Sequence, residues 1–216
     1  YRVVYRWRSA REVGGDFFDF MTLHGDKLGL LVADVSDKGI PAALYMMFAR
    51  TLMRTIAFSG RAPAAMLERS NELIVSDSTT DMFITAYYSI LDHRRHILTY
   101  ASAGHNLAFY MPADGEPEPM TTEGLVLGII NPVHIGQRSL LLAPGDLVMF
   151  YTDGVNEALS REGKEFGQER LAGLLSQHRG EPAEAIVDAI EGALREFGGG
   201  SAQYDDVTLL LLKRDA

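Results

Sequence analysis

The sequence contains no cysteine in its 216 residues, and this absence excludes several kinds of site at once. Without cysteine the chain cannot form a disulfide, a zinc ribbon or the thiolate nucleophile of a thiol phosphatase. It also lacks a signal peptide and any apolar run of the roughly 18 to 20 residues that would span a bilayer. These absences are compatible with a reducing compartment, and we expect a cytoplasmic protein without direct membrane insertion.

Positive charge is scarce, because 20 Lys and Arg stand against 29 Asp and Glu and give a formal net charge of -9. Such an acidic chain repels nucleic acid and anionic membranes unless a local basic patch overrides the average. The basic clusters, at Arg6, Arg8 and Arg11 and at 93–96, are short, and solvated turns or strand edges explain them. We therefore expect no nucleic-acid partner.

The length and a hydrophobic content of 47% favour one globular domain over residues 1–216. Period-two patterns of β-branched and aromatic residues predict strands, and helical spacing of apolar residues predicts helices. Strands are expected at 2–7, 16–22, 27–33, 82–92, 95–102, 105–111, 138–143, 146–152 and 207–213, and helices at 41–59, 63–75, 168–177 and 182–197. Because these elements are grouped rather than strictly alternating, we predict an α+β fold with two mostly antiparallel sheets flanked by helices.

Turn and loop signals predict how some elements connect. Residues 24–26 (HGD) and 144–146 (PGD) each indicate a hairpin between the strands that flank them. Residues 111–123 are acidic and rich in proline, which favours an exposed loop and disfavours a strand. The helices at 41–59 and 63–75 could form a dimer or sensor interface, or simply cover a sheet. The chain begins within a predicted strand, so we expect an upstream sensor domain or linker before it.

Aspartates stand at the ends of four predicted strands. Asp34 and Asp153 each end an apolar run. Asp205 and Asp206 precede another, and Asp16 stands at the opposite end of its strand, as a hairpin partner must if both strands are to bring carboxylates to one rim. Carboxylates gathered at one rim would repel one another unless a cation neutralised them, so the set predicts bound metal. Oxygen ligands without His or Cys select hard cations, which are Mg²⁺ or Mn²⁺ for catalysis.

Other catalytic motifs are absent. The sequence has no G-x-S-x-G elbow, no P-loop and no G-x-G-x-x-G. The segment 34–37 (DVSD) has serine, not a carboxylate, two residues after Asp34, where an aspartyl-phosphate phosphatase or an EF-hand would need one. The six histidines are scattered, and for His105 in the segment 103–106 a turn role is favoured over catalysis. A covalent mechanism therefore has no obvious nucleophile.

Five blocks of sequence resemble the PPM group of metal-dependent protein phosphatases, also called type 2C, in its bacterial SpoIIE-like branch. They are EVGGDFFD at 12–19, VADVSDKG at 32–39, AGHN at 103–106, YTDGVNE at 151–157 and DDVT at 205–208. The blocks follow the family's order and span nearly the whole chain, which makes chance similarity improbable. The resemblance implies an αββα sandwich with a two-metal site at the top of its sheets.

The resemblance also implies a role for each matching ligand residue. Asp34 would bridge both metals, and the backbone carbonyl of Val35 would ligate one of them. Asp16 would bind or orient a metal ion on one side of the site, either directly or through a metal-bound water. Asp153 and Asp205 would complete the second site. Val35 replaces the glycine of many relatives, which is harmless to a backbone ligand unless that position needs positive φ.

The implied activity is hydrolysis of phosphoserine or phosphothreonine by a water that two Mn²⁺ or Mg²⁺ ions activate. Asp206 stands where relatives often have Asn and would support the neighbouring ligands. Ser36, Asp37 and Lys38 either line the rim or form the start of the next helix. In this branch the substrate is an anti-sigma-factor antagonist that acts by partner switching. The alternatives are a noncatalytic interaction module of the same fold and a hydrolase of small phosphoesters or nucleotides.

Overall fold

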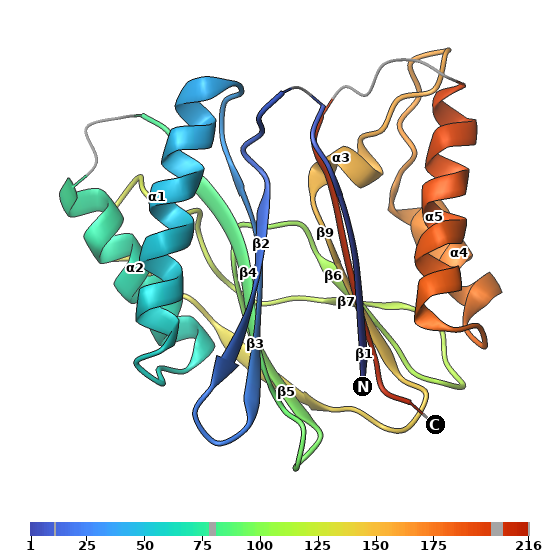
Figure 1. Ribbon diagram of the computed structural model, residues 1–216, viewed down its shortest axis with the longest axis horizontal. Coiled ribbons are helices and arrows are strands. Elements are labelled where there is room, and N and C mark those ends of the chain that lie inside the picture. Colours follow the sequence, from blue (N-terminus) through green and yellow to red (C-terminus); the bar gives the residue numbers. More distant parts are fainter. Residues whose placement is uncertain (11, 78–80, 200–204, 216) are drawn as a thin grey trace. The chain divides into compact units, whose positions relative to one another are not determined.

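The structure, a computed structural model, describes residues 1–10, 12–77, 81–199 and 205–215 (Figure 1). Arg11, which belongs to the first basic cluster, lies outside the described residues. Within the described part, no helix is both long and apolar enough to cross a membrane. The chain forms two compact units, each described here by itself: unit 1 is Tyr1–Glu12, Leu107–Met120 and Leu142–Ala216, and unit 2 is Val13–Asn106 and Thr121–Leu141.

Unit 2 contains a five-stranded antiparallel sheet in the order β2-β3-β4-β5-β8. The strands are β2 (Phe17–Leu23), β3 (Lys27–Val35), β4 (Ile84–Asp92), β5 (Ile97–Ala103) and β8 (Gln137–Leu141). The predicted β2–β3 hairpin is confirmed, since Gly25 and Asp26 take the positive φ angles of 74° and 56° that its tight turn requires. The open end of this hairpin lies within the sequence blocks at 12–19 and 32–39.

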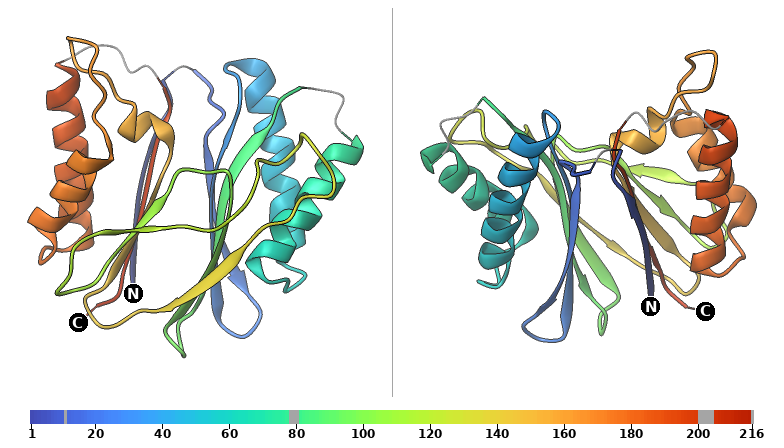
Figure 2. Two further views of the ribbon diagram at one scale, coloured as in Figure 1. Left: turned by 180° about the vertical axis from the view of Figure 1, so that it is seen from behind. Right: turned by 45° about the horizontal axis from the view of Figure 1, so that its top comes forward.

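Helices α1 (Ile40–Ala57) and α2 (Pro63–Asp77) cover one face of this sheet (Figure 2). Apolar residues at helical spacing along α1 pack against every second residue of the strands, and this creates the core of unit 2. Among the methionines of α1, Met53 is fully buried in this core, whereas Met47 is 63% exposed. Ile40 and Leu44 are also exposed, so the outward side of the first turns of α1 is apolar as well.

Unit 1 contains a second five-stranded antiparallel sheet in the order β1-β10-β9-β6-β7. The strands are β1 (Arg2–Arg8), β10 (Val207–Lys213), β9 (Leu147–Tyr151), β6 (Ala108–Met111) and β7 (Glu118–Met120). Helices α4 (Gln168–His178) and α5 (Ala183–Gly198) pack on this sheet, and the short α3 (Asp153–Asn156), which the sequence did not predict, follows β9. The fold class is therefore α+β, with two antiparallel sheets flanked by helices.

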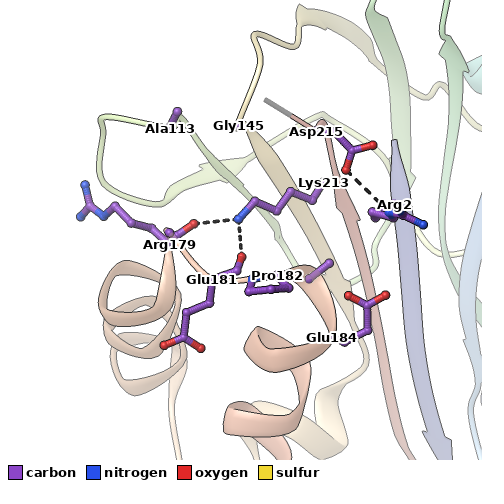
Figure 3. Close-up of a pocket in the computed structure, with 11 residues that line it drawn as sticks. Arg2, Ala113, Gly145, Arg179, Glu181, Pro182, Glu184, Lys213 and Asp215 are labelled. Carbon is purple, nitrogen blue, oxygen red and sulfur yellow. Dashed lines mark hydrogen bonds and ion pairs between the residues drawn. The ribbon is translucent and has the colours of Figure 1, made fainter.

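A pocket of 680 Å³ in unit 1 lies beside the start of α5 (Figure 3). Lys213 projects from β10 and donates hydrogen bonds to the backbone carbonyls of Arg179, at 2.8 Å, and Glu181, at 2.5 Å. Burial lowers the pKa of Lys213 from its ordinary value. The pocket is lined by acidic and basic side chains together, and none of the predicted metal ligands lines it. Lys213 thus holds the turn between α4 and α5.

Two predicted connections are wrong. The segment 144–146 does turn, with φ 87° at Gly145, but β8 pairs with β5 in unit 2 while β9 pairs with β10 and β6 in unit 1, so the two do not form a hairpin. Residues 118–120 form a strand although the proline content of the segment argued against one. Pro119 is tolerated because β7 is at the edge of its sheet, where a missing N–H donor breaks no ladder.

Candidate metal centre

Three predicted oxygen ligands come together at the open end of the β2–β3 hairpin. The antiparallel register pairs Phe17 with Ala33, so the next residues along the two strands are Asp16 and Asp34. Asp16 is almost fully buried, and Asp34 and Val35 are the last two residues of β3. The sequence placed Asp34 after its strand, whereas pairing with Thr85 and Ile84 of β4 extends the strand through Asp34 and Val35.

Gly15 brings its backbone against two of these ligands. A Cβ atom at this position would lie 2.7 Å from the carbonyl oxygen of Val35 and 3.2 Å from Oδ1 of Asp34. Only glycine leaves room for such an approach. Val35 itself is accommodated, because among the described non-glycine residues positive φ occurs only at Asp26, Asp37 and His96. The loop before β2 and the end of β3 are therefore in close contact around the three oxygens.

The chain between β3 and α1 is fixed to the sheet by Ser36. Its N–H donates to the carbonyl of Phe83, at 2.9 Å, and its hydroxyl accepts from the N–H of Phe83, at 2.8 Å. Asp37, at φ 82°, binds the N–H of Lys38 with its carboxylate, and α1 begins after Gly39. A cap of α1 by Ser36 or Asp37 is therefore wrong. Ser36 instead holds the residues that follow the Asp34 ligand.

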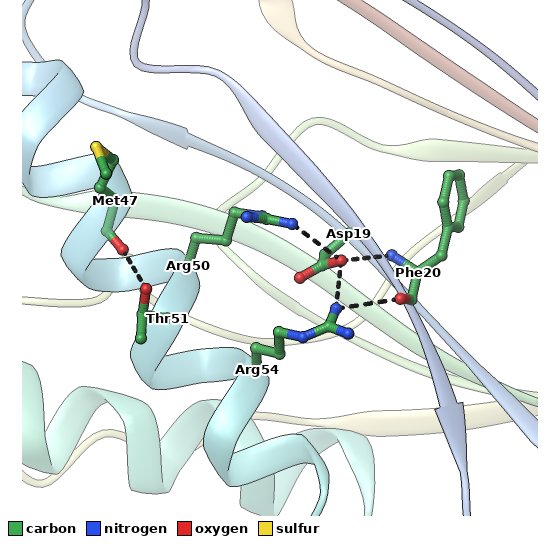
Figure 4. A network of polar contacts seen from close by, with 6 residues as sticks. All are labelled: Asp19, Phe20, Met47, Arg50, Thr51 and Arg54. Atoms are coloured by element: carbon green, nitrogen blue, oxygen red, sulfur yellow. Dashed lines mark hydrogen bonds and ion pairs between the residues drawn. The ribbon is translucent and has the colours of Figure 1, made fainter.

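Asp19, in the first sequence block, connects β2 with α1 (Figure 4). Its side chain is buried, and Oδ1 accepts from Nη1 of Arg54, at 2.7 Å, and from the N–H of Phe20, at 2.9 Å. Arg50 approaches the same oxygen at 3.4 Å, and Arg54 also donates to the carbonyl of Phe20, at 3.2 Å. Asp19 is thus paired with two guanidinium groups, which makes it a tie between the hairpin and the helix.

The other predicted ligands come together in unit 1. Thr152 donates its N–H to the carbonyl of Thr208, at 3.1 Å, and its hydroxyl accepts from the N–H of Thr208, at 3.0 Å. These bonds place the start of α3, at Asp153, beside the start of β10. The approach is so close that a Cβ atom at Gly154 would lie 1.8 Å from the carbonyl oxygen of Asp206. Glycine after Asp153 is therefore required by packing against the DDVT block.

Asp206 holds the chain that leaves β1. Its Oδ1 accepts from the hydroxyl of Ser9, at 3.0 Å, and from the N–H of Ala10, at 2.8 Å. Its own N–H donates to Oδ1 of Asp205, at 2.9 Å, which orients that carboxylate. A supporting role for Asp206 next to Asp205 stays a prediction, and these contacts are what such a role would need.

The donor set suits a hard divalent cation. In unit 2 the predicted donors are two carboxylates and one backbone carbonyl, and in unit 1 they are the carboxylates of its two blocks; within each unit none of these donors is nitrogen or sulfur. Within the ranges that the structure describes, no three His, Asp or Glu side chains by themselves form a complete metal site. At Gly15, nevertheless, the carbonyl oxygen of Val35 and Oδ1 of Asp34 both lie near one point, at 2.7 and 3.2 Å from where a Cβ atom of residue 15 would be. The residues present therefore fit Mg²⁺ or Mn²⁺.

Sequence reasoning gave His105 a role in a turn and overlooked Thr85. The turn role stays a prediction: Gly104 has a φ angle of 63°, His105 is buried, and its Nδ1 lies 2.8 Å from Oγ1 of Thr85. Thr85 stands opposite Asp34 in the β3–β4 pair. No sequence signal identifies Thr85, because its importance depends on strand register.

Comparison with known proteins identifies the family. The family described as Stage II sporulation protein E (SpoIIE) matches residues 24–215. Phosphoserine phosphatase RsbU of Bacillus subtilis is 31% identical over 206 residues, which are 95% of this chain and 61% of that protein. The chain thus spans less than two thirds of the length of this relative.

Solved structures share the fold over nearly the whole chain. The SiaA-PP2C domain of Pseudomonas aeruginosa superposes with a TM-score of 0.88 at 27% identity, covering 99% of this chain and 86% of that one. The RsbU and RsbW domains of Rv1364c from Mycobacterium tuberculosis give 0.82 at 27% identity, covering 99% and 60%. The resemblance carried by the five sequence blocks is confirmed: the chain belongs to the SpoIIE family of PP2C-type phosphatase domains.

Proposed function

We propose that residues 1–216 form one catalytic domain that hydrolyses phosphoserine or phosphothreonine on a regulatory protein. The observation that supports the proposal is the close approach at Gly15, where a Cβ atom would meet Oδ1 of Asp34 and the carbonyl oxygen of Val35, next to Asp16. Membership of a phosphatase family supports the reaction type, and RsbU, a relative over most of the chain, is named a phosphoserine phosphatase.

Phosphatases of the PP2C type depend on metal ions, and we propose two Mn²⁺ or Mg²⁺ ions here. Asp16, Asp34 and Val35 of unit 2 and Asp153 and Asp205 of unit 1 would hold them. When bound, the ions would supply the positive charge that makes water a nucleophile near neutral pH and neutralises the phosphoryl oxygens.

The protein's own contribution is to fix the ligand oxygens before substrate arrives. The close approach of Gly15 limits how far the carbonyl of Val35 and the carboxylate of Asp34 can move, and Ser36 ties the segment after them to Phe83. Burial of Asp16 removes competing water from its carboxylate. Such preorganisation is how positioning lowers the barrier for phosphoryl transfer, a reaction that needs little covalent chemistry from the protein.

For the substrate we propose an anti-sigma-factor antagonist, phosphorylated on serine or threonine, that takes part in partner switching. Support comes from the likeness to RsbU and to a solved protein that carries RsbU and RsbW domains. The net charge of -9 is also in keeping with a protein partner rather than a nucleic acid.

A phosphate-release assay tests the proposal. The purified protein would be given a phosphorylated anti-sigma-factor antagonist, p-nitrophenyl phosphate or a nucleotide, each with Mn²⁺, with Mg²⁺ and with chelator. We expect metal-dependent release that is fastest from the phosphoprotein. Asp34→Asn and Asp153→Asn should abolish it without unfolding the protein, while Asp114→Asn, on an exposed loop, should behave as wild type.

The alternatives give different results in the same assay. Release from the small esters alone would favour a hydrolase of small phosphoesters. No release from any substrate by a folded protein that binds its partner would favour a noncatalytic interaction module.

A further inference from the structure

The turn after β5 aims the His105 side chain at β4. Gly104 takes φ 63°, and a Cβ atom there would lie 2.6 Å from Cγ1 of Val126 and 3.1 Å from its backbone nitrogen. The N–H of His105 donates to the hydroxyl of Ser102, at 3.2 Å, and a β-bridge joins Gly104 to Ala86 of β4. Only 8% of His105 is exposed, and its Nδ1 lies 2.8 Å from Oγ1 of Thr85.

Thr85 connects this turn to the proposed metal ligands. It stands directly opposite Asp34 in the antiparallel β3–β4 pair. Residues that are opposite one another in such a pair project from the same face of the sheet, with Cβ atoms about 4.5 to 5.5 Å apart. The Thr85 hydroxyl is therefore bound to His105, and the Thr85 side chain projects from the same face of the sheet as that of Asp34. All three residues belong to unit 2.

The chemistry of His105, Thr85 and Asp34 indicates which group donates in the hydrogen bond between His105 and Thr85. A threonine hydroxyl has one proton to donate and can accept as well. If Nδ1 of His105 carries a proton and donates it to Oγ1 of Thr85, the hydroxyl proton is left for a carboxylate oxygen. An ionised carboxylate accepts hydrogen bonds and cannot donate them, so this direction is the one that suits Asp34 as a metal ligand.

We propose that His105 is a positioning residue that acts through Thr85 to orient the Asp34 carboxylate for metal binding. The inference rests on the proposed function, because it takes Asp34 as the ligand shared by both ions. His105 does not touch the substrate in this proposal. Partners that hold the ligands of a metal are worth roughly tenfold to hundredfold in metal affinity, which is the size of effect to be measured.

Two pairs of variants separate positioning from packing. Thr85→Val removes the hydroxyl at nearly constant volume, and Thr85→Ser keeps it. His105→Leu removes the ring nitrogens, and His105→Asn keeps a nitrogen on the same carbon that bears Nδ1. The readout is Mn²⁺ binding to the protein without substrate, followed by calorimetry and by the electron paramagnetic resonance of free Mn²⁺, with thermal unfolding measured in parallel.

We expect Thr85→Val and His105→Leu each to weaken Mn²⁺ binding roughly tenfold to hundredfold, with Thr85→Ser and His105→Asn within about threefold of wild type. The double variant Thr85→Val/His105→Leu should bind Mn²⁺ no more weakly than the worse single variant, because both act through one chain of contacts. If His105→Leu fails to fold, the Mn²⁺ affinities of Thr85→Val and Thr85→Ser still test the positioning role.

Unchanged Mn²⁺ affinity in Thr85→Val, or losses that add up in the double variant, would overturn the positioning role while leaving the proposed function intact. Loss of stability without loss of Mn²⁺ affinity would show that the turn only packs. A wild-type protein that binds no Mn²⁺ would overturn the proposed function, and this inference with it.

Discussion

Substitution of Gly15 by alanine adds one methyl group at the point where the loop before β2 meets two proposed ligands. The φ angle of Gly15 is not in the positive range, so alanine introduces no backbone strain there. The effect must come from contact: the new Cβ atom would lie 2.7 Å from the Val35 carbonyl oxygen and 3.2 Å from Oδ1 of Asp34. Gly15→Ala is therefore a steric probe of the ligand group.

The size of the effect follows from these distances. Carbon and oxygen atoms that are not bonded rarely approach within about 3 Å, so the Val35 carbonyl must move by at least about 0.3 Å. Overpacking of this kind costs about 1 to 3 kcal/mol in the free energy of unfolding. Mg²⁺ and Mn²⁺ demand near-octahedral geometry with short bonds to oxygen. We therefore expect the Mn²⁺ concentration at half-maximal activity, the Mn²⁺ midpoint, to rise roughly tenfold or more.

The assay combines urea unfolding with a Mn²⁺ titration of phosphate release. Gly192→Ala, in the interior of α5, is the matched control, because a Cβ atom there meets no atom within 4 Å. It should raise stability by about 0.5 to 1 kcal/mol and leave the Mn²⁺ midpoint unchanged. A Gly15→Ala protein with a wild-type Mn²⁺ midpoint would refute the assignment of the Val35 carbonyl and Asp34 as ligands.

Three further predictions concern the same framework. In Gly154→Ala the new Cβ atom would lie 1.8 Å from the Asp206 carbonyl oxygen, so the free energy of unfolding in urea should fall by about 3 kcal/mol or more. An unchanged urea concentration at half-unfolding would contradict this close packing. Arg54→Met should cost about 1 to 2 kcal/mol and Arg50→Met about 0.5 kcal/mol or less, because Arg54 makes the shorter bond to buried Asp19; equal losses would contradict this ranking. Exhaustive chelation should abolish phosphate release and added Mn²⁺ should restore it, and turnover by metal-free protein would argue against any metal mechanism.

Strands and helices with strong local signals could be predicted from the sequence. The β2–β3 hairpin follows from alternating apolar residues around a tight turn, and β10 follows from the run VTLLLLK. The partner of β8 could not be predicted, because the PGD turn reports that the chain bends and not which sheet each flanking strand joins. The strand at 118–120 was missed for a related reason: the energetic cost of proline in a strand depends on whether that strand is at the edge of a sheet, which the sequence does not show.

In the candidate site, too, locally signalled residues could be predicted and those that depend on sheet pairing could not. Asp16, Asp34, Asp153 and Asp205 could be proposed from short motifs, because each stands beside a run of apolar residues that is visible in the local sequence. Their supports could not, because contacts such as Thr85 opposite Asp34 depend on strand register. The requirement for glycine at 15 was likewise hidden, because it arises from the backbone of a segment 20 residues further along the chain.

The pairing of β1 with β10 has a consequence for rearranging the chain. Arg2 is opposite Lys213, and the amino group of Tyr1 lies 3.0 Å from the carboxylate of Asp215. A short flexible linker would therefore join these two positions without stretching either strand. The circularised backbone could be reopened in the exposed β4–β5 turn at 93–96, to give a circular permutant with every strand pair retained. In that permutant β10 and β1 would follow one another as a local hairpin, so their pairing would no longer require closure of a loop that contains all the other strands.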